Sequence, residues 1–131
     1  MATIKSFSDL PQSKRLAEIL PLESADMYYH YNTSVVKNYH EDIPNIIQLN
    51  NHFAFFNDDI PCWSLAALLK VIPKKIKDFN VLRIDISEKD FSIWYDEIGC
   101  GVNNELPDIT NESAVDACYE MILKLHELNL L

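Results

Sequence analysis

The chain has 131 residues, of which 48% are hydrophobic, so it can bury a real core and is not generally disordered. Eleven Lys and Arg against twenty Asp and Glu give a net charge of −9. This excess argues against binding to nucleic acid or to anionic membranes, because both are bound mainly through basic residues. No apolar run approaches the roughly 20 residues of a membrane-spanning helix, and we see no signal peptide.

The N-terminal part predicts two short helices. Ser8 or Asp9 can cap the first helix, Pro11 is tolerated in its first turn, and Pro21 ends it. A second short helix is predicted to begin at Pro21, with an acidic residue near its positive end.

An aromatic stretch follows these helices. It contains Tyr28, Tyr29, His30 and Tyr31 in a row. These side chains either line a ligand pocket or pack at the edge of the core with their hydroxyls in water. The candidate binding residues of the whole chain are all aromatic: Tyr28, Tyr29, Tyr31, Trp63 and Trp94.

The middle of the chain predicts a hairpin and then a central helix. Residues 46–49 and 52–56 are typical of short strands, and the two asparagines between them can adopt positive φ. Ser64 is a good N-cap for the helix, Trp63 has staple spacing to Leu68, and Pro73 ends the helix. The basic residues after it are expected to complement its negative end.

The second half predicts a hairpin and a final helix. Apolar residues alternate in residues 81–86 and 91–95, with a polar turn between them. Residues 97–109 lack a period and hold both glycines, which favours a turn that needs positive φ, although a functional loop stays open. Ser113 begins a capping-box pattern, with Thr110 as an alternative cap, and a broad apolar face runs to Leu128.

These elements predict one α+β domain over residues 1–131. Short N-terminal helices precede a ββαββα order, with an antiparallel sheet packed on the central and C-terminal helices. The alternative is a mostly helical domain with one hairpin. The predicted core consists of Leu65, Leu68, Leu69, Ile84, Ile93, Cys118, Ile122 and Leu125.

No motif predicts catalysis, and we expect no cofactor. His40, Glu41 and Asp42 form the densest set of metal-binding residue types, but His-Glu-x-x-His and Cys-x-x-Cys are both absent, so we expect no metal site. We expect Cys62 to be a small buried residue, because Cys is among the most buried residue types, and the alternative is a reactive thiol whose pKa the nearby helix N-terminus would lower. The three cysteines are an odd number, which favours reduced thiols and a cytoplasmic location.

The chain also resembles a known group of proteins. Residues 12–20, 24–27, 61–69 and 114–121 carry the similarity. They resemble uncharacterised small proteins of gut Bacteroides-type bacteria and of their phages and mobile elements. The resemblance implies a bacterial cytoplasm and supplies no mechanism.

For function, we expect a non-enzymatic protein that acts by protein–protein interaction, as an accessory factor of a phage or mobile element. The alternatives are a small-ligand binding domain with an aromatic pocket and a thiol- or carboxylate-based enzyme. A protein partner is expected, and a homodimer is left open. Mimicry of DNA by the acidic surface is also left open. An exposed apolar patch favours the first hypothesis, and a closed aromatic pocket favours the second.

Overall fold

The computed structural model describes residues 5–32, 38–39, 44–46 and 59–131, and it confirms the α+β class. The chain forms two compact units. The N-terminal unit is Ser6–Ala67, and the C-terminal unit contains Lys5 and Leu68–Leu131. We describe each unit by itself, and the single domain stays a prediction. None of the helices in the described ranges is long and apolar enough to cross a membrane.

The N-terminal unit begins with helix α1 (Leu10–Ala17), capped by Asp9. The Asp9 carboxylate accepts the Gln12 N–H at 2.9 Å, and the Gln12 side chain accepts the Asp9 N–H at 3.1 Å. This reciprocal capping box confirms the predicted start of the helix.

The second short helix predicted from Pro21 is present only as one 3₁₀ turn with Pro21 as its N-cap. A single 3₁₀ turn, η1 (Leu22–Ser24), is followed by extended backbone at Ala25. The Ser24 hydroxyl donates to the Pro21 carbonyl at 2.6 Å. Short polar side chains that bond nearby backbone compete with helix formation, so the turn does not continue.

A three-stranded antiparallel sheet follows, in the order β4 (Asn45–Ile46), β1 (Met27–Tyr29), β5 (Ile60–Cys62). Strands β2 (Tyr31–Asn32) and β3 (Asn38–Tyr39) form a separate pair. The predicted hairpin over residues 46–56 lies outside the described residues except for Ile46, which belongs to β4. One core cluster of the unit consists of Leu10, Tyr29 and Cys62, packed by Phe7, Met27 and Ile60.

Helix α2 (Leu65–Val71) has the predicted start. The Ser64 hydroxyl accepts the Ala67 N–H at 3.2 Å, which confirms Ser64 as the N-cap. At the other end, the Lys74 ammonium donates to the carbonyls of Leu69 and Ile72. A cation at this position complements the negative end of the helix, as expected for the basic cluster.

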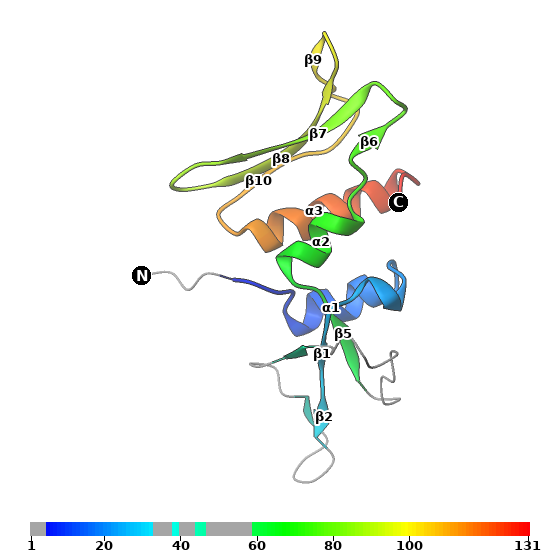
Figure 1. Cartoon of the computed structure of the whole chain (residues 1–131), viewed down its shortest axis with the longest axis vertical. Coiled ribbons are helices and arrows are strands. Elements are labelled where there is room, and N and C mark those ends of the chain that lie inside the picture. Colours follow the sequence, from blue (N-terminus) through cyan, green and yellow to red (C-terminus); the bar gives the residue numbers. More distant parts are fainter. Residues whose placement is uncertain (1–4, 33–37, 40–43, 47–58) are drawn as a thin grey trace. The chain divides into compact units, whose positions relative to one another are not determined.

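The C-terminal unit is built on an antiparallel sheet in the order β10 (Asp108–Asn111), β8 (Phe91–Glu97), β7 (Asn80–Ile86), β6 (Lys75–Ile76). The predicted hairpin is confirmed as β7 and β8 (Figure 1). Strand β9 (Gly101–Val102) also pairs with β8. Both glycines have φ of 84°, so the expected positive-φ turn is confirmed before β9, whereas β9 and β10 themselves were not predicted.

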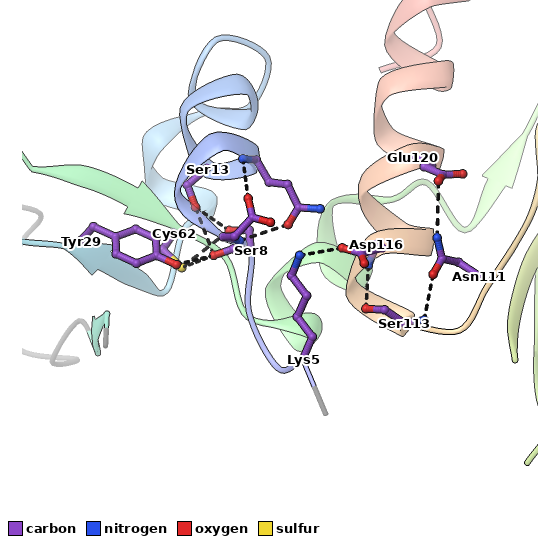
Figure 2. Close-up of polar contacts among 11 residues, drawn as sticks. Lys5, Ser8, Ser13, Tyr29, Cys62, Asn111, Ser113, Asp116 and Glu120 are labelled. Atoms are coloured by element: carbon purple, nitrogen blue, oxygen red, sulfur yellow. Dashed lines mark hydrogen bonds and ion pairs between the residues drawn. The ribbon is translucent and has the colours of Figure 1, made fainter. Parts of the chain in front are cut away.

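Helix α3 (Ala114–Glu127) packs on β8 and β10. Its cap is Ser113, whose hydroxyl accepts the Asp116 N–H at 3.2 Å, while Asn111 accepts the Ser113 N–H at 2.9 Å. The Asp116 carboxylate accepts a hydrogen bond from Lys5 at 2.7 Å, which fixes the first described residue to this helix (Figure 2). The buried face is Val115, Ala117, Cys118, Met121, Ile122 and Leu125.

The predicted core is confirmed at most positions and wrong at one. Leu65 and Leu69 are half-buried, and Ile84 is 40% exposed. Ile84 lies opposite the fully buried Ile93, but α3 packs on β8 and β10, and β7 lies on the far side of β8 from β10. The helix therefore covers Ile93 and leaves Ile84 at the margin. The confirmed core residues are Leu68, Ile93, Cys118, Ile122 and Leu125.

Candidate functional site

A buried polar cluster links α1, β1 and β5 of the N-terminal unit (Figure 2). The hydroxyls of Ser8 and Ser13 lie 2.7 Å apart. The Ser8 carbonyl accepts the Tyr29 hydroxyl at 2.8 Å and the Cys62 thiol at 3.4 Å. Ser8, Ser13, Tyr29 and Cys62 are all fully buried. Polar groups buried in this way need internal partners, and the cluster supplies them to one another.

The thiol of Cys62 is unsuited to nucleophilic catalysis. Burial raises its pKa above the usual value of 9.0 and outweighs the opposing hydrogen bonds from Ser8 and Ser13. The expected small buried residue is therefore confirmed at Cys62, and the alternative of a helix start that lowers this pKa is not. A thiol attacks as the thiolate, and desolvation disfavours that form. Cys62 acts here as a packed residue whose S–H has an internal acceptor.

The aromatic candidates occupy different environments. Trp63 is fully buried, and its indole N–H donates to the Ser24 hydroxyl at 2.9 Å. Tyr29 is buried in the polar cluster, and Tyr28 is half-buried in β1. Trp94 is half-buried in the C-terminal unit, opposite Arg83 on β7. For Tyr31 only the backbone is described, in β2. That these residues bind a ligand stays a prediction.

The structure brings together one pair of side chains that the sequence left apart. His30 Nδ1 and Asp59 Oδ1 lie 3.1 Å apart, with the Asp59 side chain 2% exposed and the His30 side chain 45% exposed. The antiparallel register of β1 and β5 pairs Tyr29 with Ile60, which brings His30 and Asp59 side by side. A carboxylate that holds one imidazole nitrogen orients the ring. The edge of the Tyr28 ring lies against the same imidazole, with centroids 6.5 Å apart.

Within the described ranges, no group of three His, Cys, Asp or Glu side chains is arranged to hold a metal ion. The predicted weak candidate at His40, Glu41 and Asp42 lies outside those ranges.

The most distinctive surface of the C-terminal unit is the outer edge of β7. Among the described strands, β6 pairs only with residues 80 and 81 of β7, and the rest of that edge has no partner strand. Ile84 is 40% exposed and Ile86 is 76% exposed. Both lie on the face that α3 covers farther along the sheet, because their cross-strand neighbours Ile93 and Phe91 are buried. We call residues 83–87 the open edge.

The backbone groups of the open edge can be assigned from two hydrogen bonds. The Leu82 N–H donates to the Lys74 carbonyl at 2.9 Å, so it points away from β8. The Ser87 N–H donates to the Asp90 carbonyl at 2.9 Å, so it points toward β8. Backbone groups alternate in direction along a strand. Ile84 and Ile86 therefore direct their N–H and C=O groups outward, beside exposed apolar side chains.

We compared the chain with protein-family models, with curated proteins and with solved structures, and no match was found in any of the three. The function therefore has to be argued from the surface and the chemistry of the described residues.

Proposed function

We propose that this protein acts by binding another protein, through the open edge of β7, rather than by catalysis. The observation that supports this proposal is the combination of outward-pointing backbone groups with two exposed isoleucines at residues 84 and 86. An unpaired edge strand is a template for a strand of another chain, and main-chain hydrogen bonds with alternate side-chain contacts hold such complexes together.

Two further features support a binding role. The cysteine thiols of Cys62 and Cys118 are buried, and the hydroxyls of the polar cluster bond to partners within the unit. These groups therefore serve to pack and stabilise the fold. An edge strand is normally blunted by charged side chains, above all Lys, by Pro or by a bulge. Residues 83–87 contain no Pro or Lys, β7 pairs with β8 without a break in register, and Arg83 and Asp85 are the charged side chains on this edge. On the resemblance described above, we propose that the protein carries out this role in a bacterial cytoplasm, as an accessory factor of a phage or mobile element.

The test uses a photoreactive phenylalanine analogue placed at position 86 and, as the control, at position 98. Ile98 is 61% exposed and follows β8 at the opposite end of the same hairpin. In producing cells, we expect discrete protein adducts from position 86 and only background from position 98. Equal adducts at both positions, or none at either, would overturn the proposal.

A small-ligand role is the second candidate, and one observation favours it. The His30 imidazole is held by the buried Asp59 carboxylate, next to the half-buried Tyr28 ring. A polar group fixed beside an aromatic ring is the kind of element that orients a ligand. A fragment screen by NMR tests this role: binding that shifts the His30 and Tyr28 signals and is lost in His30→Ala supports it, and shifts elsewhere alone contradict it.

A further inference from the structure

We infer that the strand which occupies the open edge is the open edge of a second copy of this chain. This inference rests on the proposed function, because it names the partner of the same edge.

A strand that adds to the open edge must itself have an unpaired edge. Among the strands of the described ranges, each copy of the chain brings one, in residues 83–87 of β7. Two copies can use it together only in antiparallel orientation about a two-fold axis, which makes the interface self-complementary. The resulting sheet runs without interruption from one C-terminal unit into the other.

The fit of the backbone determines the register. Lys74 occupies the position beside Leu82, where it accepts the Leu82 N–H, so a second strand cannot extend past residue 83. At the other end, the hairpin turns back after residue 87. An axis at Asp85 aligns the two open edges over this length. Ile84 of one copy then lies opposite Ile86 of the other, and the outward N–H and C=O groups of both residues gain partners.

In the same register, exposed side chains of one copy lie beside those of the other copy on each face of the sheet. Ile84 and Ile86 of the two copies form one apolar strip, which extends the face covered by α3. Burying them removes the two most exposed apolar side chains of β7 from water, which is the main favourable contribution to association.

The charges lie on the opposite face, with Arg83 and Asp85 two residues apart on β7. In the two-fold register the Asp85 carboxylates meet at the axis, and the Arg83 guanidinium of each copy is the diagonal neighbour of the other copy's Asp85. The two Asp85 carboxylates repel each other at the axis, and the two diagonal Arg83–Asp85 pairs of opposite charge offset this repulsion. The alternation of Arg and Asp thus fits the edge to a copy of itself. Within the chain, Arg83 Nε also lies 3.7 Å from Asp96 Oδ2, so the guanidinium forms an ion pair on the same face as the proposed contact.

The first test measures the mass of the purified full chain by analytical ultracentrifugation over a range of concentrations. We expect the mass to rise toward twice 15.1 kDa. Ile86→Lys should raise the dissociation constant at least about tenfold, because it puts a charge into the apolar strip. Ile98→Lys makes the same change of charge at a similarly exposed position outside the open edge, and it should leave the dissociation constant unchanged.

The second test exchanges charges. Arg83→Asp makes the edge wholly acidic, and Asp85→Arg makes it wholly basic, so each variant alone should remain monomeric. A mixture of the two should form a heterodimer, since only opposite edges then meet. Circular dichroism of each variant checks that both are folded.

Three outcomes are distinct. Dimers that follow this pattern support the inference. A dimer that is insensitive to positions 83, 85 and 86 overturns it, because another surface is then responsible. A chain that stays monomeric at all concentrations also overturns it, while the proposed function stands if position 86 still forms adducts with a different protein.

Discussion

Ser64 donates two hydrogen bonds to the same carboxylate: its N–H reaches Oδ1 of Asp26 at 2.9 Å, and its hydroxyl reaches Oδ2. Asp26 precedes β1, and Ser64 caps α2, so one side chain fixes the start of the helix to the sheet of the N-terminal unit. The hydroxyl also accepts the Ala67 N–H at 3.2 Å. The cap is therefore part of a three-residue arrangement, and its parts should depend on one another.

This relationship predicts energetic coupling between Ser64 and Asp26. Ser64→Ala should lower the free energy of unfolding by about 0.5–2 kcal/mol through loss of the cap. Asp26→Ala should lower it by about 1–3 kcal/mol, because two donors lose their acceptor. The double variant should cost less than the sum of the two, with a coupling of about 0.5–3 kcal/mol. Urea unfolding of the four proteins measures it, and additive losses would contradict the arrangement.

Trp63 should behave as a core residue with a polar anchor. Trp63→Ala should lower the free energy of unfolding by about 3–5 kcal/mol, because a large and fully buried side chain is removed. Trp63→Phe keeps an aromatic ring but loses the N–H that donates to Ser24, so its cost should be smaller. Ser24→Ala is the matched control for that hydrogen bond. An unchanged urea midpoint in Trp63→Ala would contradict this role.

Leu68 and Ile84 were both predicted to be core residues, and the structure separates them. Leu68→Ala should cost about 2–5 kcal/mol, through lost burial and a cavity. Ile84→Ala should cost less than about 1 kcal/mol, since the side chain is already 40% exposed. Urea midpoints, measured at a concentration where the chain is monomeric, test both. Equal losses would mean that Ile84 is covered within a single chain.

This contrast shows how far the sequence predicts the fold. Local signals predicted the caps at Asp9, Ser64 and Ser113 and the β7–β8 hairpin, because a cap or a tight hairpin is determined by residues close in the chain. The burial of Ile84 was predicted wrongly because strand alternation identifies a face but not which part of that face a helix covers.

The open edge and the His30–Asp59 pair both depend on contacts between residues that are far apart in the chain. That β7 is an open edge follows from the order of the strands, and β10, which moves β8 to the interior, was not predicted at all. The pairing of His30 with Asp59 likewise follows from the register of β1 and β5, which are about thirty residues apart in the chain. The residues that form both features can be read in the sequence, but strand order and register, which bring them together, cannot.

The three cysteines should differ in reactivity. All three are free, Cys100 is exposed, and Cys62 and Cys118 are buried. In the native protein, iodoacetamide should modify Cys100 quickly and the other two slowly, since attack requires an accessible thiolate. In urea without reductant, all three should react. Mass spectrometry counts the adducts, and fast native modification of Cys118 would contradict the buried face of α3.

The buried thiols also predict a loss of stability at alkaline pH. Burial raises the pKa of Cys118 from 9.0 to about 12, with Lys74 acting weakly in the opposite sense. Burial also raises the pKa of Cys62 and of Tyr95. Above pH 9 the unfolded chain releases its Cys118 proton while the folded chain keeps it, so the folded state binds more protons. The free energy of unfolding should therefore fall as the pH rises from 9.0 toward about 12.

The size of this effect is bounded by the linkage relation, at about 1.4 kcal/mol per pH unit for each such group. Urea unfolding at several pH values across this interval measures the slope. Cys118→Ala should be less stable at neutral pH but should lose less stability as the pH rises, because it has one fewer proton to release on unfolding. Cys100→Ala is the matched control, because it removes an exposed thiol instead of a buried one. Identical slopes in wild type and Cys118→Ala would show that Cys118 is not desolvated in the folded chain.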